Sequence, residues 1–161
     1  MADYSTMPDA VLGRLRSSAA AATVGDTYLM AEGTGRVRFA FDYLPPPGPD
    51  ADAPYLPYVV ITEPGESREY FTRQEDGLRP FLADGSLTVQ CWGETREAAR
   101  VLAQQVTTAL HDAPIDWGGT NRSTLFRPVS VVAPPVPPAG PNAPTVFVRV
   151  ITIEFQYQGL A

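Results

Sequence analysis

The chain has 161 residues, of which 44% are hydrophobic and 19% are charged. These values are ordinary for a soluble globular protein and exclude an intrinsically disordered chain, so we expect a single domain over residues 1–161. The formal net charge of −6 supplies no cationic surface for phosphates, which excludes a protein that wraps DNA tightly.

The N-terminus and the cysteine content bear on where the protein is made. The segment MADYSTMPDAVLGRLRSS lacks the apolar core of a signal peptide. No apolar run approaches the roughly 20 residues that span a bilayer. Cys91 is the only cysteine, so an intramolecular disulfide and an all-cysteine metal site are both excluded. We therefore expect synthesis in the cytoplasm and no membrane segment.

A helix is predicted near the N-terminus. Thr6 is a suitable cap, Pro8 fits the first turn, and Asp9 favours the positive end of the helix dipole. The apolar stripe of this helix, which we expect to end at residues 23–25, consists of Val11, Leu12, Leu15 and Ala19.

Two predicted strands follow this helix. RVRFAFDY, residues 36–43, alternates polar and apolar side chains with the period of a half-buried strand, and Arg36 and Arg38 lie on its non-core face. These arginines either face solvent or meet carboxylates of a partner. LPPPGPDADAP, residues 44–54, predicts an exposed proline-rich loop, and LPYVVITE, residues 56–63, predicts the second strand.

Residues 64–85 are polar and interrupted by glycine and proline, so the sequence predicts an insertion without a regular element there. The insertion is richer in apolar residues than a simple linker. We expect these apolar side chains to be covered, and they belong to Tyr70, Phe71, Leu78, Phe81 and Leu82.

The most regular unit of the sequence reads SLTVQCWGETREAARVLAQQVTTALHD. Leu87, Val89 and Cys91 point to one face of a strand. Gly93 permits a turn after this strand, and Thr95 can cap the helix that follows. The helix carries an apolar stripe suited to packing on a sheet, formed by Ala98, Leu102, Val106, Ala109 and Leu110.

Two further strands complete the pattern. LFRPVSVV, residues 125–132, is a strand in which Pro128 favours an edge or a bulge, and APPVPPAGPNAP, residues 133–144, predicts an extended surface connector. The last strand, residues 145–158, is apolar on both sides in its first half. Both sides then need a cover, either from loops or from a second subunit. The candidate subunit interface comprises Val146, Val148, Val150, Arg36 and Arg38.

The order of these elements predicts an α+β fold. We expect a mostly antiparallel sheet of four to five strands, with two helices packed on one face and long proline-rich loops.

The sequence gives little support to catalytic or metal chemistry. Cys91 and His111 are the best candidates for a catalytic dyad. The helix between them, however, places them roughly 25 Å apart at 1.5 Å per residue. Cys91 is then a core residue and His111 a helix-terminal one. Asp50 and Asp52 resemble the start of a calcium loop that lacks its other ligands. We expect no catalytic residue, no metal site and no cofactor.

Several of these features occur together in one known family. The N-terminal helix, the strand LPYVVI after a proline-bearing loop, the unit LTVQCWGETREAARVLAQQVTTAL and the closing amphipathic strand resemble the tail terminator, or tail-completion, proteins of long-tailed bacteriophages and gene transfer agents. The resemblance covers most of the chain in order. The insertion at residues 64–85 and the APPVPPAGPNAP loop depart from a minimal member, which leaves the loop contacts of the family open here.

The resemblance implies a structural virion protein and not an enzyme. Such proteins form a homohexameric ring on the head-proximal end of the tail tube, at the tail–neck junction, and stop tube polymerisation. The implied partners are other copies of the chain, the tail tube protein and a neck or head-completion protein, while DNA passes through without sequence-specific binding. Two alternatives stay open: another neck or tail-tube ring subunit of the same particle, and a small enzyme of an unrecognised α+β family.

Overall fold

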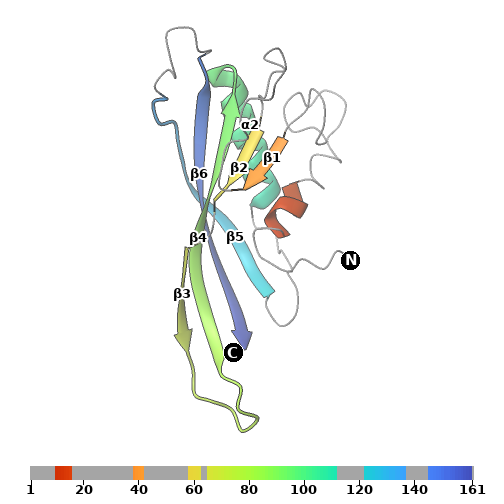
Figure 1. Ribbon diagram of the computed structural model, residues 1–161, viewed down its shortest axis with the longest axis vertical. Helices are drawn as coiled ribbons and strands as arrows, with labels where there is room; N and C mark the ends of the chain where they lie inside the picture. Colours follow the sequence, from red (N-terminus) through yellow and green to blue (C-terminus); the bar gives the residue numbers. More distant parts are fainter. Residues whose placement is uncertain are drawn as a thin grey trace.

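The computed structural model describes residues 10–15, 38–41, 58–62, 65–111, 122–136 and 145–160, of which residues 38–41, 122–125 and 160 are described by their backbone alone. Residues 10–15 are helical. The other elements, shown in Figure 1, are β1 (Arg38–Phe41), β2 (Tyr58–Ile61), β3 (Gly65–Tyr70), β4 (Pro80–Gly93), α2 (Arg96–Leu110), β5 (Arg122–Val132) and β6 (Phe147–Leu160).

The strands form one sheet in the order β1-β2-β4-β6-β5, and β3 also pairs with β4. β2 pairs with residues 89–92 of β4 and β3 with residues 81–86, so the two short strands share one edge of the long strand. These pairings are antiparallel except for the parallel pair of β1 and β2. The predicted α+β class and mostly antiparallel sheet are confirmed, and β2 and β3 occupy a single position across the sheet.

β4 and β6 form the centre of the sheet and pair along their whole length, from Pro80 opposite Leu160 to Gly93 opposite Phe147. Neighbouring side chains of a strand point to opposite faces. We call the face that carries the odd-numbered residues of these two strands the core face, and the opposite face the outer face. The buried residues of the core face include Phe81, Ala83, Leu87, Val89, Cys91, Ile151, Ile153, Phe155 and Tyr157.

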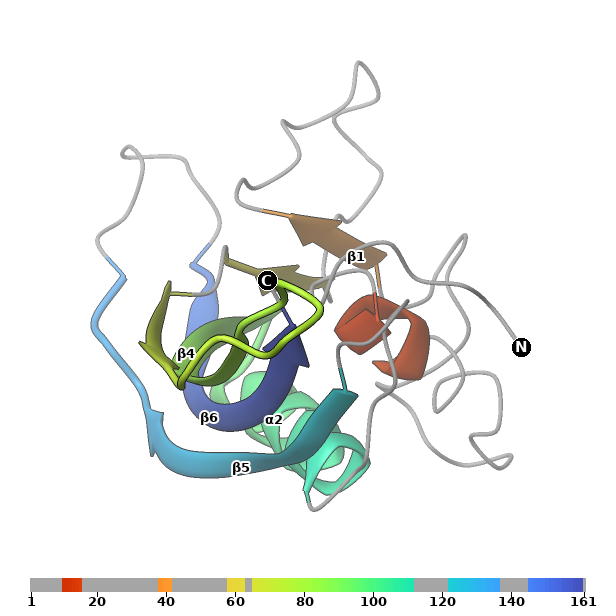
Figure 2. The same cartoon turned by 90° about the horizontal axis from the view of Figure 1, so that it is seen from below.

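The helix α2 covers the core face. Its N-terminus is capped as predicted, because the Thr95 hydroxyl accepts a hydrogen bond from the Ala98 N–H at 3.0 Å. The predicted stripe is confirmed, since each of its residues is buried: Ala98, Leu102, Val106, Ala109 and Leu110. The helical segment at residues 10–15 joins the same core, and the Arg14 Nε donates to the Ala109 carbonyl oxygen at 3.2 Å. Figure 2 shows how strongly the sheet curls from β4 through β6 to β5.

The prediction that residues 64–85 form an insertion without a regular element is wrong. β3 and the first half of β4 build a β-hairpin whose tip projects from the lower end of the sheet in Figure 1. The sequence hides the alternation of β4 because a glycine, Gly85, occupies a core-face position. The ring of Phe155 fills the space there, since a Cβ on Gly85 would lie 2.5 Å from Phe155 Cζ.

β5 confirms the position predicted for Pro128. The strand lies at the edge of the sheet beside β6, and its register shifts between Pro128 and Ser130. Proline cannot donate a ladder hydrogen bond, so an irregular edge strand accommodates it.

Some predictions concern residues outside the described part of the chain. They include both ends of the first helix, Arg36, and the proline-rich segments at residues 44–54 and 137–144. Asp50 and Asp52 fall in the first of these segments. Of the helices that the structure describes, none is long and apolar enough to cross a bilayer.

Candidate functional site

The outer face is organised in rows of side chains that run across the sheet, because directly paired residues share a face. One row contains Tyr58, Trp92 and Val148. The rings of Tyr58 and Trp92 stack with their centroids 5.8 Å apart, and the Trp92 Nε1 donates to the Gln90 Oε1 at 3.1 Å. Burial raises the pKa of Tyr58 to about 12. This row is a packed layer of the subunit.

The valines of the predicted interface differ in their exposure within one subunit. Val148 is only 5% exposed, so it is largely covered before any partner binds. Val146 and Val150 are partly exposed. Val150 lies on the outer face and pairs with Val132 of β5. The valines that remain available for a contact are therefore Val146 and Val150.

The arginines of the predicted interface are placed only in part. Arg38 lies opposite Tyr58 in the register, in line with the row that continues to Val148. Arg36 lies outside the described residues. The sheet thus brings the position of Arg38 to the same row as Val148, and a role for these residues in subunit contact stays a prediction.

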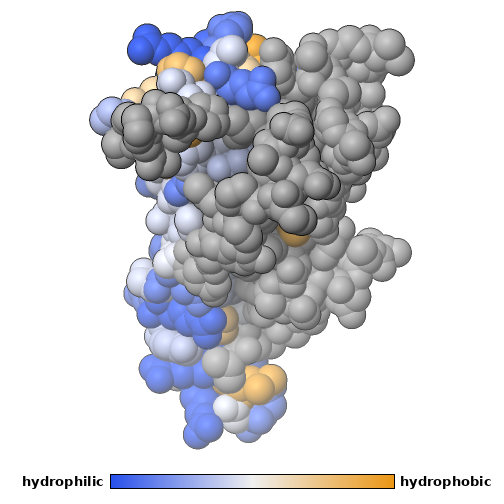
Figure 3. Space-filling model, turned by 45° about the horizontal axis from the view of Figure 1, so that its top comes forward, coloured by the Kyte–Doolittle hydropathy of each residue, from blue (hydrophilic) through white to orange (hydrophobic). Residues whose placement is uncertain are grey.

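The exposed large apolar side chains of the described residues fall into two patches. The tip patch, at the end of the β3–β4 hairpin, consists of Tyr70, Phe71 and Leu78, which are 42–47% exposed. The β5 patch consists of Val129, Val131 and Val132, which are 47–53% exposed. It covers both sides of this edge strand, because Val131 pairs with Ile151 of the core face and Val132 with Val150 of the outer face. Figure 3 shows apolar atoms near the lower end of the molecule, among hydrophilic ones.

Within one subunit, the expected cover is present for Phe81, which is 3% exposed, and absent for the three side chains of the tip patch. The run VSVV after Pro128 is the sequence signal for the β5 patch. The register shift at the proline decides on which side of the sheet each valine lies, and this shift is not visible in the sequence.

Hydrogen bonds within the hairpin fix the conformation of the tip. The Phe71 N–H donates to the Pro80 carbonyl oxygen at 2.8 Å, and the Gln74 N–H donates to the Leu78 carbonyl oxygen at 2.8 Å. Gly77 adopts a positive φ of 86°, which closes the turn at little cost for glycine. The tip is therefore a preorganised structure that presents its apolar side chains in a fixed arrangement.

A polar cluster anchors the root of the hairpin to β6. The Tyr157 hydroxyl donates to the Glu66 Oε2 at 2.6 Å, and the Arg68 Nε donates to the Glu66 Oε1 at 2.7 Å. The Arg68 guanidinium also lies 4.6 Å from the centre of the Phe81 ring. Burial, followed by the hydrogen bond to Glu66, raises the pKa of Tyr157 to about 12. The cluster ties β3 to β6 across β4.

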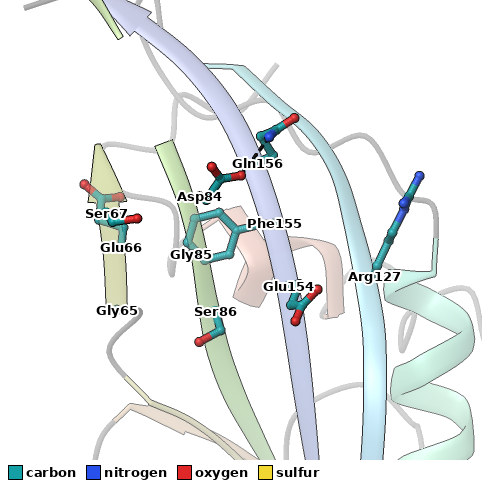
Figure 4. Close-up of a pocket in the computed structure, with 10 residues that line it drawn as sticks. All are labelled: Gly65, Glu66, Ser67, Asp84, Gly85, Ser86, Arg127, Glu154, Phe155 and Gln156. Carbon is teal, nitrogen blue, oxygen red and sulfur yellow. Dashed lines mark hydrogen bonds between the residues drawn. The ribbon is translucent and has the colours of Figure 1, made fainter. Parts of the chain in front are cut away.

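An open hollow of about 820 Å³ lies beside this root (Figure 4). Asp84 accepts a hydrogen bond from the Gln156 Nε2 at 2.7 Å across its floor. Glu154 pairs in register with Arg127, whose side chain extends away from it. Throughout the described residues, no group of three metal-binding side chains comes together. The hollow is an open polar surface whose lining pairs no nucleophile with a histidine.

Cys91 and His111 lie toward opposite ends of α2. Cys91 is fully buried on the core face, where burial raises the pKa of its thiol. His111 follows the last turn of the helix, and its backbone N–H donates to the Thr107 carbonyl oxygen at 2.8 Å. The 15 residues of α2 lie between them. Cys91 is therefore the core residue that the sequence predicted.

Known proteins share this fold and much of this sequence pattern. The family model of tail completion protein gp17 matches residues 9–132. No curated protein matches the chain. One chain of a solved structure, described as the virion of a native gene transfer agent (GTA) particle, is 19% identical and matches with a TM-score of 0.51 over 95% of both chains.

The two comparisons carry different weight. At this low identity, the likeness to the gene transfer agent chain shows a shared fold over nearly the whole length. The family match covers well over half of the chain and confirms the resemblance to tail-completion proteins. The chain belongs to the tail completion protein gp17 family, a family of structural proteins of the virion tail.

Proposed function

We propose that the protein is the subunit of a closed homohexameric ring on the head-proximal end of a phage tail tube. The ring ends polymerisation of the tail tube protein and offers its other side to a neck or head-completion protein. The observation that carries this proposal is the match of the tail completion family over residues 9–132. The chain acts as a single domain over residues 1–161, without catalysis, metal or cofactor.

The proposal also assigns a location and a path for DNA. The ring sits at the tail–neck junction of the virion, and its subunit is made in the cytoplasm of the bacterial host. DNA passes through the ring without sequence-specific binding. The net charge of −6 supports this passage, because an acidic subunit repels phosphate groups.

Subunit contact involves the outer face near the start of β6. A closed ring requires heterologous contacts, in which two different surfaces of the subunit meet. Val146 and Val150 contribute to one of these surfaces together with Arg36 and Arg38, and the buried Val148 lies between the two valines along the chain. Val132, which pairs with Val150, is 53% exposed and extends the apolar area at this end of the sheet.

Val150→Glu tests this contact more cleanly than a change at Val148, which is buried within the subunit. A charge placed in an apolar contact is expensive unless it is paired, so we expect sedimentation velocity to show smaller species. Circular dichroism should stay near native. The control Gln158→Glu adds the same charge at an exposed position of β6 and should leave assembly unchanged. If Val150→Glu assembles fully, these valines are not part of the subunit interface.

Native mass spectrometry of the purified protein tests the ring itself. We expect a dominant species of six times the subunit mass of 17.4 kDa. The proposal fails if the protein is a monomer at every concentration and does not bind tail tubes in a pelleting experiment.

A further inference from the structure

The tip patch and the β5 patch lie toward different ends of the sheet. The tip patch lies near Pro80, which pairs with Leu160, whereas the β5 patch ends at Val132, which pairs with Val150. Ten residues of β6 separate these two positions. At about 3.3 Å per residue, this corresponds to roughly 30 Å of strand. The two patches of one subunit are therefore too far apart to cover each other.

The tip patch has the composition of a binding anchor. Aromatic side chains and arginine are enriched among the residues that carry most of the energy of protein interfaces. Here Tyr70 and Phe71 are accompanied by Arg79, whose guanidinium lies 5.3 Å from the centre of the Tyr70 ring. Because backbone hydrogen bonds already fix the tip, little conformational entropy is lost when it binds.

The arginines of the tip are already held by the hairpin. The Arg79 Nε donates to the Phe71 carbonyl oxygen at 2.7 Å, and the Arg73 Nε donates to the Gly77 carbonyl oxygen at 2.8 Å. Binding of the tip to an apolar surface therefore leaves these two donors with their partners.

The β5 patch offers an apolar surface of this kind. The segment VSVVAPPV, residues 129–136, contains no charged residue, and all but its last residue are exposed. Through the pairing of Val132 with Val150, the patch is also continuous with the valines of the proposed interface. An apolar group can therefore bind there without desolvating a charged side chain of this segment.

We infer that the tip patch of one subunit seats on the β5 patch of a neighbouring copy of the chain. The inference rests on the proposed ring and names the two surfaces that meet in its contact. A heterologous contact needs two different surfaces at separate places on the subunit. The exposed large apolar side chains of the described residues form two such patches, and a head-to-tail contact between copies buries both.

Two variants, each damaging one patch, test this pairing when they are mixed. Phe71→Asp damages the tip and leaves the β5 patch intact, while Val132→Asp, on the side of β5 that continues to Val150, does the reverse. Both residues are about half exposed, so we expect native circular dichroism from each variant. Sedimentation velocity should show each variant alone as a monomer. The 1:1 mixture should form dimers and nothing larger, because one intact tip can seat on one intact β5 patch.

The control Gln104→Asp adds the same charge on the exposed side of α2 and should assemble like the wild type. The pairing is overturned if both patch variants assemble fully, or if their mixture stays monomeric while each keeps native circular dichroism. It is also overturned if Phe71→Asp still forms rings but no longer binds tail tubes, since the tip would then recognise the tube protein. The proposed ring itself is refuted by a different result, which is a wild-type protein that stays monomeric at every concentration and does not bind tail tubes.

Discussion

Leu102 has no exposed surface and lies within the apolar stripe of α2, against the core face of the sheet. We expect Leu102→Ala to lower the free energy of unfolding by about 2–5 kcal/mol, because the lost contacts and the remaining cavity both destabilise the core. Gln104 lies on the exposed side of the same helix. Gln104→Ala should change the free energy of unfolding by less than about 0.5 kcal/mol. Urea unfolding measures both values, and equal effects would contradict the placement of α2.

Gly85 is the residue on which the packing of Phe155 depends. A Cβ added there would lie 2.5 Å from both Phe155 Cζ and the Gly65 carbonyl oxygen. Gly85→Ala should therefore destabilise the protein by about 1–3 kcal/mol through overpacking. Gly65→Ala is the matched control, because its Cβ would meet no atom within 4 Å. Thermal unfolding of the two variants checks this, and a control that is as destabilised as Gly85→Ala would argue against the Phe155 contact.

At the scale of elements, we expect the tip of the β3–β4 hairpin to be needed for assembly but not for folding. Replacing residues 71–80 by Asn-Gly joins Tyr70 directly to Phe81, which already pair in register, through a turn suited to a two-residue hairpin. We expect cooperative unfolding close to that of the wild type and loss of the assembled species in size-exclusion chromatography. A shortened variant that elutes like the wild type would show that the tip makes no subunit contact.

Elements with local signals could be predicted from the sequence, and elements that depend on distant partners could not. α2 follows from its cap at Thr95 and its apolar stripe, both of which lie within the helix. The first half of β4 was missed because Gly85 breaks its pattern, and its partner Phe155 comes from a strand far along the chain. β3 was missed because all six of its residues are exposed, so it carries no alternation of buried and exposed side chains. The faces on which Val131 and Val132 of β5 lie depend on the register shift after Pro128, which only the pairing with β6 defines.

At the scale of the whole molecule, the architecture suits a subunit that associates head to tail. The sheet is long, its two exposed apolar patches lie toward different ends, and the core is closed within one chain by α2 and the helical segment at residues 10–15. Because the chain belongs to the tail completion family, the virion tail is the place where we expect such an association. The central claim is that the assembled ring ends the growth of the tube.

The most direct test follows tube length by negative-stain electron microscopy while purified tail tube protein polymerises from preformed tube ends. Addition of the wild-type protein should stop elongation and leave one cap per tube, at a single end. The Phe71→Asp variant, added at the same concentration, should leave elongation unchanged because it does not form the ring. Tubes that keep lengthening in the presence of the wild-type protein, or that carry it along their sides, would contradict the account.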